Sequence, residues 1–161
     1  MLWIDIIIFM IFMGYTLAGT IRGFIHELLS LSILMIAVWV GLTFSREFSM
    51  LLSITLKHPA VRAAFSFTGL LLITVFIGRN IQLLLAELIN KDIGFINRLC
   101  GMILGCLHGT LVIAVAIMLA GLTPLPKEPW WDASVSISPF QLLAISLAKS
   151  TQSEMATYIS F

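Results

Sequence analysis

The ionisable side chains of this sequence are few, and three of them lie close together in the segment 22–27: Arg22, His26 and Glu27. Ionisable residues beside long apolar segments often mark a path for an ion or a substrate, so this cluster is a candidate functional site. The alternative is that the three side chains form the polar tip of a tight connection between two helices. Asp5 also allows two interpretations. A carboxylate beside an apolar segment could serve an ion path, whereas the macrodipole alone favours a carboxylate in the first turn of a helix.

A second group of polar residues accompanies the last long apolar run, Leu99 to Leu122, which contains no charged residue. His108 lies inside this run, where its imidazole could line a polar interior or hydrogen-bond to another helix. Asn97 and Arg98 immediately precede the run. The candidate functional polar residues are therefore Asp5, Arg22, His26, Glu27, Asn97, Arg98 and His108.

No pattern typical of an enzyme active site is present. The three histidines, His26, His58 and His108, lie in three different segments, without another His, Cys or Asp at the spacing of metal ligands. None of the serines lies in a nucleophile-elbow pattern, and the glycine-rich run does not follow a strand as a phosphate-binding loop would. We therefore expect no enzymatic activity, no metal and no cofactor. The net charge of +1 gives no support for a nucleic-acid partner.

Composition indicates that a membrane surrounds these polar residues. Of the 161 residues, 60% are hydrophobic and 11% are charged, and the mean hydropathy is +1.07. A water-soluble domain of this size needs roughly twice that share of charge to cover its surface. The lipid bilayer is therefore the first partner that the sequence predicts.

Four apolar segments are long enough, or nearly so, to cross the ~30 Å hydrocarbon core as helices. The second covers only ~25 Å unless it begins at Phe24. The link 22–27 between the first two is so short that we expect them to form an antiparallel hairpin. Pro59 predicts a helix start before the third. The four predicted spans of this all-α, polytopic membrane protein are Leu2–Thr20, Leu28–Phe44, Ala63–Ile77 and Leu99–Leu122.

The third span allows two interpretations, because its apolar run is short and meets Arg79. In the first, the span continues to about Leu85 and Arg79 extends its guanidinium to the lipid headgroups. In the second, the span ends near Gly78 and a separate interfacial helix follows. Such a helix has apolar residues at helical spacing and an i,i+4 pair of Glu87 and Lys91.

The sequence changes character after the fourth span, where three prolines follow in quick succession: Pro124, Pro126 and Pro129. We therefore divide the chain into a four-helix transmembrane domain, 1–122, and a linker with an amphipathic C-terminal tail, 123–161. A new helix start is indicated by a serine cap, a proline at the first helical position and a glutamine at the third: Ser138, Pro139 and Gln141. The helix that follows, from about 139 to 149, rises only ~17 Å and should lie against the membrane or the bundle without forming a fifth span.

Small residues at a spacing of four predict close contacts between helices, because lipid is as apolar as leucine and packing has to hold the helices together. One set lies on the fourth span and a second on the first: Gly101, Gly105 and Gly109, with Gly14 and Ala18. Such faces are compatible with a homo-oligomer or with a membrane-protein partner.

The tryptophans predict which helix ends share one interface. Trp3 opens the first span, Trp39 lies near the end of the second, and Trp130 and Trp131 follow the fourth. Four spans place both termini on one side, so all four indoles fall at that interface, as an aromatic belt requires. Basic residues give no orientation, because both faces carry four: Arg46, Lys57, Arg62 and Lys127 on one, and Arg22, Arg79, Lys91 and Arg98 on the other.

An ordered set of motifs extends over nearly the whole chain. The first motif is Trp-Ile-Asp at Trp3 to Asp5, and the second is an Arg-Gly-Phe turn at Arg22 to Phe24 that is followed by Glu27 and Ser30. The third is Asn-Arg-Leu at Asn97 to Leu99, before the repeated glycines Gly101, Gly105 and Gly109. The fourth is Trp131 ahead of Ser134. In this order the motifs resemble the colicin V production protein family of bacterial inner-membrane proteins. The resemblance implies a multi-pass, four-helix protein of the cell inner membrane that is needed for the production or export of a bacteriocin and for envelope physiology. The chain departs from the family pattern at Asn97, where aspartate is expected, and at His108, where arginine often precedes the last glycine.

Three classes of function remain open. An oligomeric channel or transport component predicts that the glycine face packs around an axis and that His108 faces a central opening. A membrane adaptor for a secretion or envelope complex predicts that the glycines hold the chain's own bundle together and that the polar groups are buried or paired. An intramembrane enzyme needs paired polar residues that face each other across helices.

Overall fold

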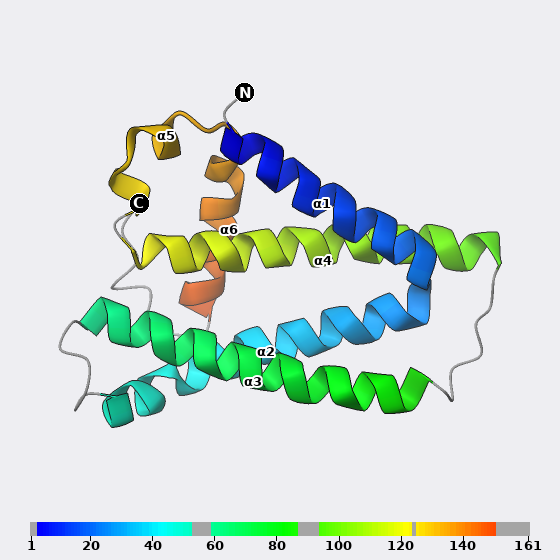
Figure 1. Ribbon diagram of the computed structural model, residues 1–161, viewed down its shortest axis with the longest axis horizontal. Coiled ribbons are helices and arrows are strands. Elements are labelled where there is room, and N and C mark those ends of the chain that lie inside the picture. Colours follow the sequence, from blue (N-terminus) through cyan, green and yellow to red (C-terminus); the bar gives the residue numbers. More distant parts are fainter. Residues whose placement is uncertain (1–2, 53–58, 87–93, 124, 151–161) are drawn as a thin grey trace.

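The computed structural model describes residues 3–52, 59–86, 94–123 and 125–150, and the regular elements in these ranges are helices (Figure 1). Four of them contain 20 to 28 residues, which corresponds to a rise of roughly 30 to 42 Å. All four are long and apolar enough to cross a membrane, so the predicted all-α architecture with four spanning helices is confirmed. They are α1 (Trp3–Arg22), α2 (Phe24–Leu51), α3 (Pro59–Ala86) and α4 (Phe95–Gly121).

The long helices pack mainly as two pairs, α1 with α4 and α2 with α3, and α2 also contacts α4. The chain reverses direction between α1 and α2 at a single residue, Gly23. Figure 1 shows that the two helices run in opposite directions from this turn, as the predicted antiparallel hairpin requires, and then diverge. The reason is that α4 offers α1 a face of glycines, which permits closer packing than the larger side chains of α2.

Apolar side chains from α2, α3 and α4 form the main core. Phe67 and Met118 are completely buried in it, and Phe67 lies against the backbone of Gly41, where a Cβ atom would come 2.8 Å from the ring. A second cluster joins the beginning of α1 and the end of α4 to the C-terminal segment: Ile8, Ile113, Ile117, Trp131 and Ile137. The C-terminal segment is thus packed onto the bundle.

The second and third spans are longer than their apolar runs suggest. α2 begins at Phe24 and continues past Phe44 to Leu51, because its polar last turns still have a buried side on which Arg62 Nε donates a hydrogen bond to Ser49 Oγ (2.7 Å). α3 begins at Pro59, as predicted, and passes Gly78 without interruption. The interpretation with a continuous third span is therefore correct, and the separate helix starting near Gly78 is wrong. The proposed pair of Glu87 and Lys91 lies outside the described residues.

Three short helices follow α4: a 3-10 turn η2 (Leu125–Lys127), α5 (Pro129–Asp132) and α6 (Ile137–Ser150). α6 begins earlier than its sequence signals predict, so Ser138 and Pro139 lie inside its first turn, where proline is tolerated. With 14 residues it rises only ~21 Å. It crosses α4 (Figure 1) and buries Ile137 and Ala144. As expected, the tail helix lies against the bundle and is too short to be a fifth span.

Candidate functional site

The glycines of α4 lie against the backbone of α1. A Cβ atom added at Gly105 would come 2.5 Å from the carbonyl oxygen of Tyr15 and 3.2 Å from the Cα atom of Gly19. At Gly109 it would come 3.1 Å from Tyr15 Cβ, and at Gly101 it would collide with the carbonyl oxygen of Gly19. This face is therefore filled by another helix of the same chain.

Gly19 is the partner residue that sequence reasoning missed. A Cβ atom at Gly19 would collide with the carbonyl oxygen of Gly101, so the two helices approach through glycine on both sides. The signal was present, because Gly19 and Gly23 are also four residues apart. The set chosen from the sequence, Gly14 and Ala18, faces elsewhere: a Cβ atom at Gly14 meets nothing within 4 Å, and both residues line a cavity.

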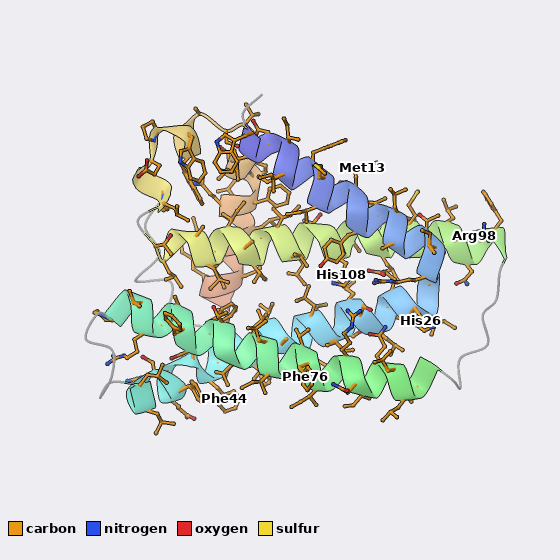
Figure 2. The ribbon with its side chains drawn as sticks, in the orientation of Figure 1. Met13, His26, Phe44, Phe76, Arg98 and His108 are labelled. Atoms are coloured by element: carbon orange, nitrogen blue, oxygen red, sulfur yellow. The ribbon has the colours of Figure 1, made fainter. Side chains whose placement is uncertain are left out.

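Glu27 and His108 meet in the interior of the bundle. Oε1 of Glu27 on α2 and Nδ1 of His108 on α4 form a hydrogen bond of 2.6 Å. The carboxyl group is completely buried and the imidazole is 10% exposed. The ring of Tyr15 on α1 lies 4.7 Å from the imidazole, measured between centroids. Figure 2 shows His108 on the side of α4 that faces α2. This contact ties three helices together at one point.

The turn between α1 and α2 is fixed by Asn97 of α4. Its Oδ1 accepts a hydrogen bond of 2.8 Å from the backbone N–H of Phe24, which is one of the unpaired donors at the start of α2. Gly23 has a φ of +84°, a conformation that other residues rarely adopt, and a Cβ atom there would lie 2.7 Å from Asn97 Nδ2. Asn97 thus acts as a cap supplied by another helix.

Arg22 and His26 do not join the Glu27–His108 contact. Arg22 lines a cavity of about 430 Å³ bounded by the four long helices, together with Arg79 and Gln82 of α3. The same three residues and His26 line an adjoining cavity of about 310 Å³. Gln82 Nε2 donates hydrogen bonds to the carbonyl oxygen of His26 (3.0 Å) and to Ser30 Oγ (2.9 Å). The predicted cluster at 22–27 is therefore split between two environments.

Asp5 connects the start of α1 to the segment after α5. Its Oδ1 accepts hydrogen bonds from Ser134 Oγ (2.6 Å) and from the backbone N–H of Ser136 (3.2 Å). These contacts place the carboxylate in a structural role as well as in the first turn of the helix. Arg98 lies near the beginning of α4, exposed and away from His108 (Figure 2).

Three of the four tryptophans gather at one end of the bundle. The centroids of Trp3 and Trp130 are 5.3 Å apart, and those of Trp130 and Trp131 are 5.7 Å apart. Trp131 is buried in the second apolar cluster. Trp39 is exposed and lies midway along α2, because that helix continues to Leu51, so the expectation that it lies near the end of the helix is wrong.

Comparison with known proteins gives matches over most of the chain. The family described as "Colicin V production protein" matches residues 4–147. The "Colicin V production protein" of Escherichia coli (strain K12) is 26% identical over 145 residues, covering 89% of each chain. The "Colicin V production protein homolog" of Haemophilus influenzae is 25% identical over 139 residues, covering 85% of each. No solved structure matches significantly.

Proposed function

Because this chain belongs to the colicin V production protein family, we propose that it supports bacteriocin production as a scaffold in the bacterial inner membrane that conducts nothing itself. The main support for this proposal is that the glycine face and the buried polar residues make their contacts within one chain. A channel built around the glycine face would need that face to be available to other copies, and α1 occupies it.

The Glu27–His108 contact also supports the scaffold. A buried polar pair that joins helices far apart in sequence fixes their relative position, and breaking such a pair typically costs about 3 to 5 kcal/mol. The pair meets the requirement for an intramembrane enzyme only in part, since the Glu27 side chain is completely buried and out of reach of a substrate. A structural role accounts for the hydrogen bond between Glu27 Oε1 and His108 Nδ1.

One observation favours the channel as a second candidate. His108 also lines the cavity of about 430 Å³, so one side of the imidazole is next to a space that Arg22, Arg79 and Gln82 share. In this alternative, the cavity belongs to a transport path through the single bundle or through an oligomer.

Two measurements on the same protein test the proposal, and the second, ion flux, separates the scaffold from the channel. In an Escherichia coli strain that carries colicin V genes but lacks its own colicin V production protein, the scaffold should restore the zone of growth inhibition around colonies. The purified chain in liposomes should pass no more ions than protein-free liposomes. Ion flux that disappears in the His108→Leu variant would overturn the scaffold and establish the channel. Gly105→Leu is the control for a bundle that does not assemble.

Membrane location and topology are part of the proposal. We expect the chain in the inner-membrane fraction, with Phe95 and Val135 on opposite sides, because α4 lies between them. Both side chains are exposed, at 79% and 85%. With the native cysteines replaced by alanine, Phe95→Cys and Val135→Cys should react with an impermeant maleimide from opposite sides. Labelling of both from one side would contradict the four-span topology.

A further inference from the structure

Two arginines from different helices line one cleft, which neither the scaffold role nor the Glu27–His108 contact explains. Arg22 and Arg79 line both adjoining cavities, of about 430 and 310 Å³, and we call the combined space the arginine cleft. No aspartate or glutamate is present among the described residues that line it. Among the described residues, neither guanidinium has an ion-pair partner.

Each arginine alone has an ordinary explanation. Arg22 ends α1, where the macrodipole favours a cation, and Arg79 could extend to the headgroups from a long span. Their shared place in the lining of both cavities is different, because nearby cations repel each other and an anion placed beside both reduces that repulsion. The cleft therefore fits a negatively charged group.

Both arginines lie toward the same end of the four-helix bundle. Arg22 lies about 28 Å along α1 from Trp3, and Arg79 lies about 30 Å along α3 from Pro59, at about 1.5 Å per residue. Because α1 and α3 run in the same direction in a four-span bundle, these distances place both guanidiniums near the same membrane surface. Figure 1 shows the ends of α1 and α3 on the same side of the molecule.

Beyond the arginines the cleft has a mixed lining of polar and apolar residues, and it reaches the lipid-facing surface. From Arg22 toward the start of α1 the lining includes Ala18, Tyr15, Gly14 and Met10, and side chains of the other long helices complete it, among them Leu34, Val75 and His108. Met10 in the larger cavity and Leu83 in the smaller are 66% and 64% exposed. α1 and α3 are not among the helix pairs that pack together, so the cleft lies between two helices that leave space for a ligand.

We propose that the arginine cleft binds an anionic glycerophospholipid, with the phosphate between Arg22 and Arg79 and the upper part of an acyl chain against Gly14 and Met10. Guanidinium groups bind phosphate oxygens through charge-assisted, often bidentate hydrogen bonds. Gln82 and Ser30 line the same space and are held in place by their mutual hydrogen bond of 2.9 Å. A volume of a few hundred cubic ångströms is typical of sites that take a drug-sized group, so the cleft holds the headgroup region and not a whole lipid.

The test is native mass spectrometry of the full chain released from nanodiscs that contain phosphatidylglycerol and phosphatidylcholine with identical acyl chains. The wild type should retain one phosphatidylglycerol with a preference of at least about tenfold, because both lipids offer a phosphate but the two arginines repel the choline cation of phosphatidylcholine. Arg22→Gln with Arg79→Gln should lose this preference. Arg98→Gln is the matched control, because Arg98 lies at the same end of the bundle outside the cleft. Equal loss in the control would overturn the proposal.

Two further experiments test the proposal even if the double variant, Arg22→Gln with Arg79→Gln, does not fold. Gly14→Leu keeps both arginines and adds bulk where a Cβ atom meets nothing within 4 Å, so the chain should fold while losing the bound lipid. Retention of phosphatidylglycerol in a folded Gly14→Leu protein would show that the lipid does not enter the cleft. Millimolar inorganic phosphate should leave the bound lipid in place, and its displacement by phosphate would identify a free anion as the ligand.

Discussion

One face of α1 packs against the glycines of α4 in a contact that we call the α1–α4 junction, and another face of α1 borders the arginine cleft. The junction is filled by helix backbone, whereas the cleft is open space. At the junction, Gly19 meets Gly101 and Gly105 with backbone against backbone. In the cleft, Gly14 has open space in front of it and shares the lining with two arginines. The comparison shows that a small residue brings two helices together only when the residue facing it on the other helix is also small. The larger of the two side chains sets the distance between the helices.

The strongest test of this comparison is a matched pair of leucine substitutions. Gly105→Leu should prevent α1 from packing on α4 and destabilise the bundle by more than about 3 kcal/mol, because the added atoms meet backbone that cannot move aside. Gly14→Leu should leave the fold intact. Accumulation in the membrane and the denaturation midpoint in detergent measure both. Equal tolerance of leucine at the two positions would remove the distinction between junction and cleft.

The next largest effect concerns the contact at the border of the two regions. His108→Leu should destabilise the bundle by about 3 kcal/mol, because it leaves the carboxyl group of Glu27 buried without its partner. Replacing both residues, with Glu27→Leu and His108→Leu, should recover most of the loss, and a double-mutant cycle in detergent measures the coupling. Additive losses in the double variant would show that the contact does not stabilise the fold.

A smaller effect is expected at the end of the junction, where Asn97 caps α2. Asn97→Ala should cost about 1 kcal/mol, the usual value of a lost helix cap, and Asn97→Asp should cost nothing because it keeps the accepting oxygen and adds a favourable charge. Thermal unfolding of the two variants checks the order. A destabilised Asn97→Asp would show that the amide nitrogen is the group that matters.

The smallest effect has the opposite sign. Gly14→Ala should stabilise the protein by about 0.5 to 1 kcal/mol, because alanine favours the helix and the cleft has room for its methyl group. Gly105→Ala should instead destabilise it, since its Cβ atom would lie 2.5 Å from a carbonyl oxygen. Unfolding curves of the two variants in detergent measure the effect of one added methyl group on the stability of each region.

The sequence was sufficient for the elements that depend on local pattern. The four spans, the start of α3 at Pro59 and the short tail helix follow from apolar length, proline position and helix rise, which are properties of neighbouring residues. The end of α2 was missed because Arg46 and Glu47 interrupt the apolar run, although the buried side of the helix continues through Ser45 and Ser49. Its length depends on α3, which contacts it there through Arg62.

The sequence did not predict which of the candidate residues contact one another. Asp5, Glu27, Asn97 and His108 were candidates because they are polar residues in or beside apolar segments, and all four form hydrogen bonds to distant parts of the chain. The pairing of Glu27 with His108, 81 residues apart, requires the rotation of two helices about their axes. The sequence contains no measure of that rotation.

By itself, the sequence determined that this is a four-span membrane protein of the colicin V production protein family, because hydropathy and the order of motifs depend only on the order of residues in the chain. Only the tertiary structure decided which face of α1 is closed by glycines and which is left open beside Arg22. Both faces carry small residues at the same spacing, and their difference arises from the register of α4 against α1. That register is set by contacts between residues far apart in the chain.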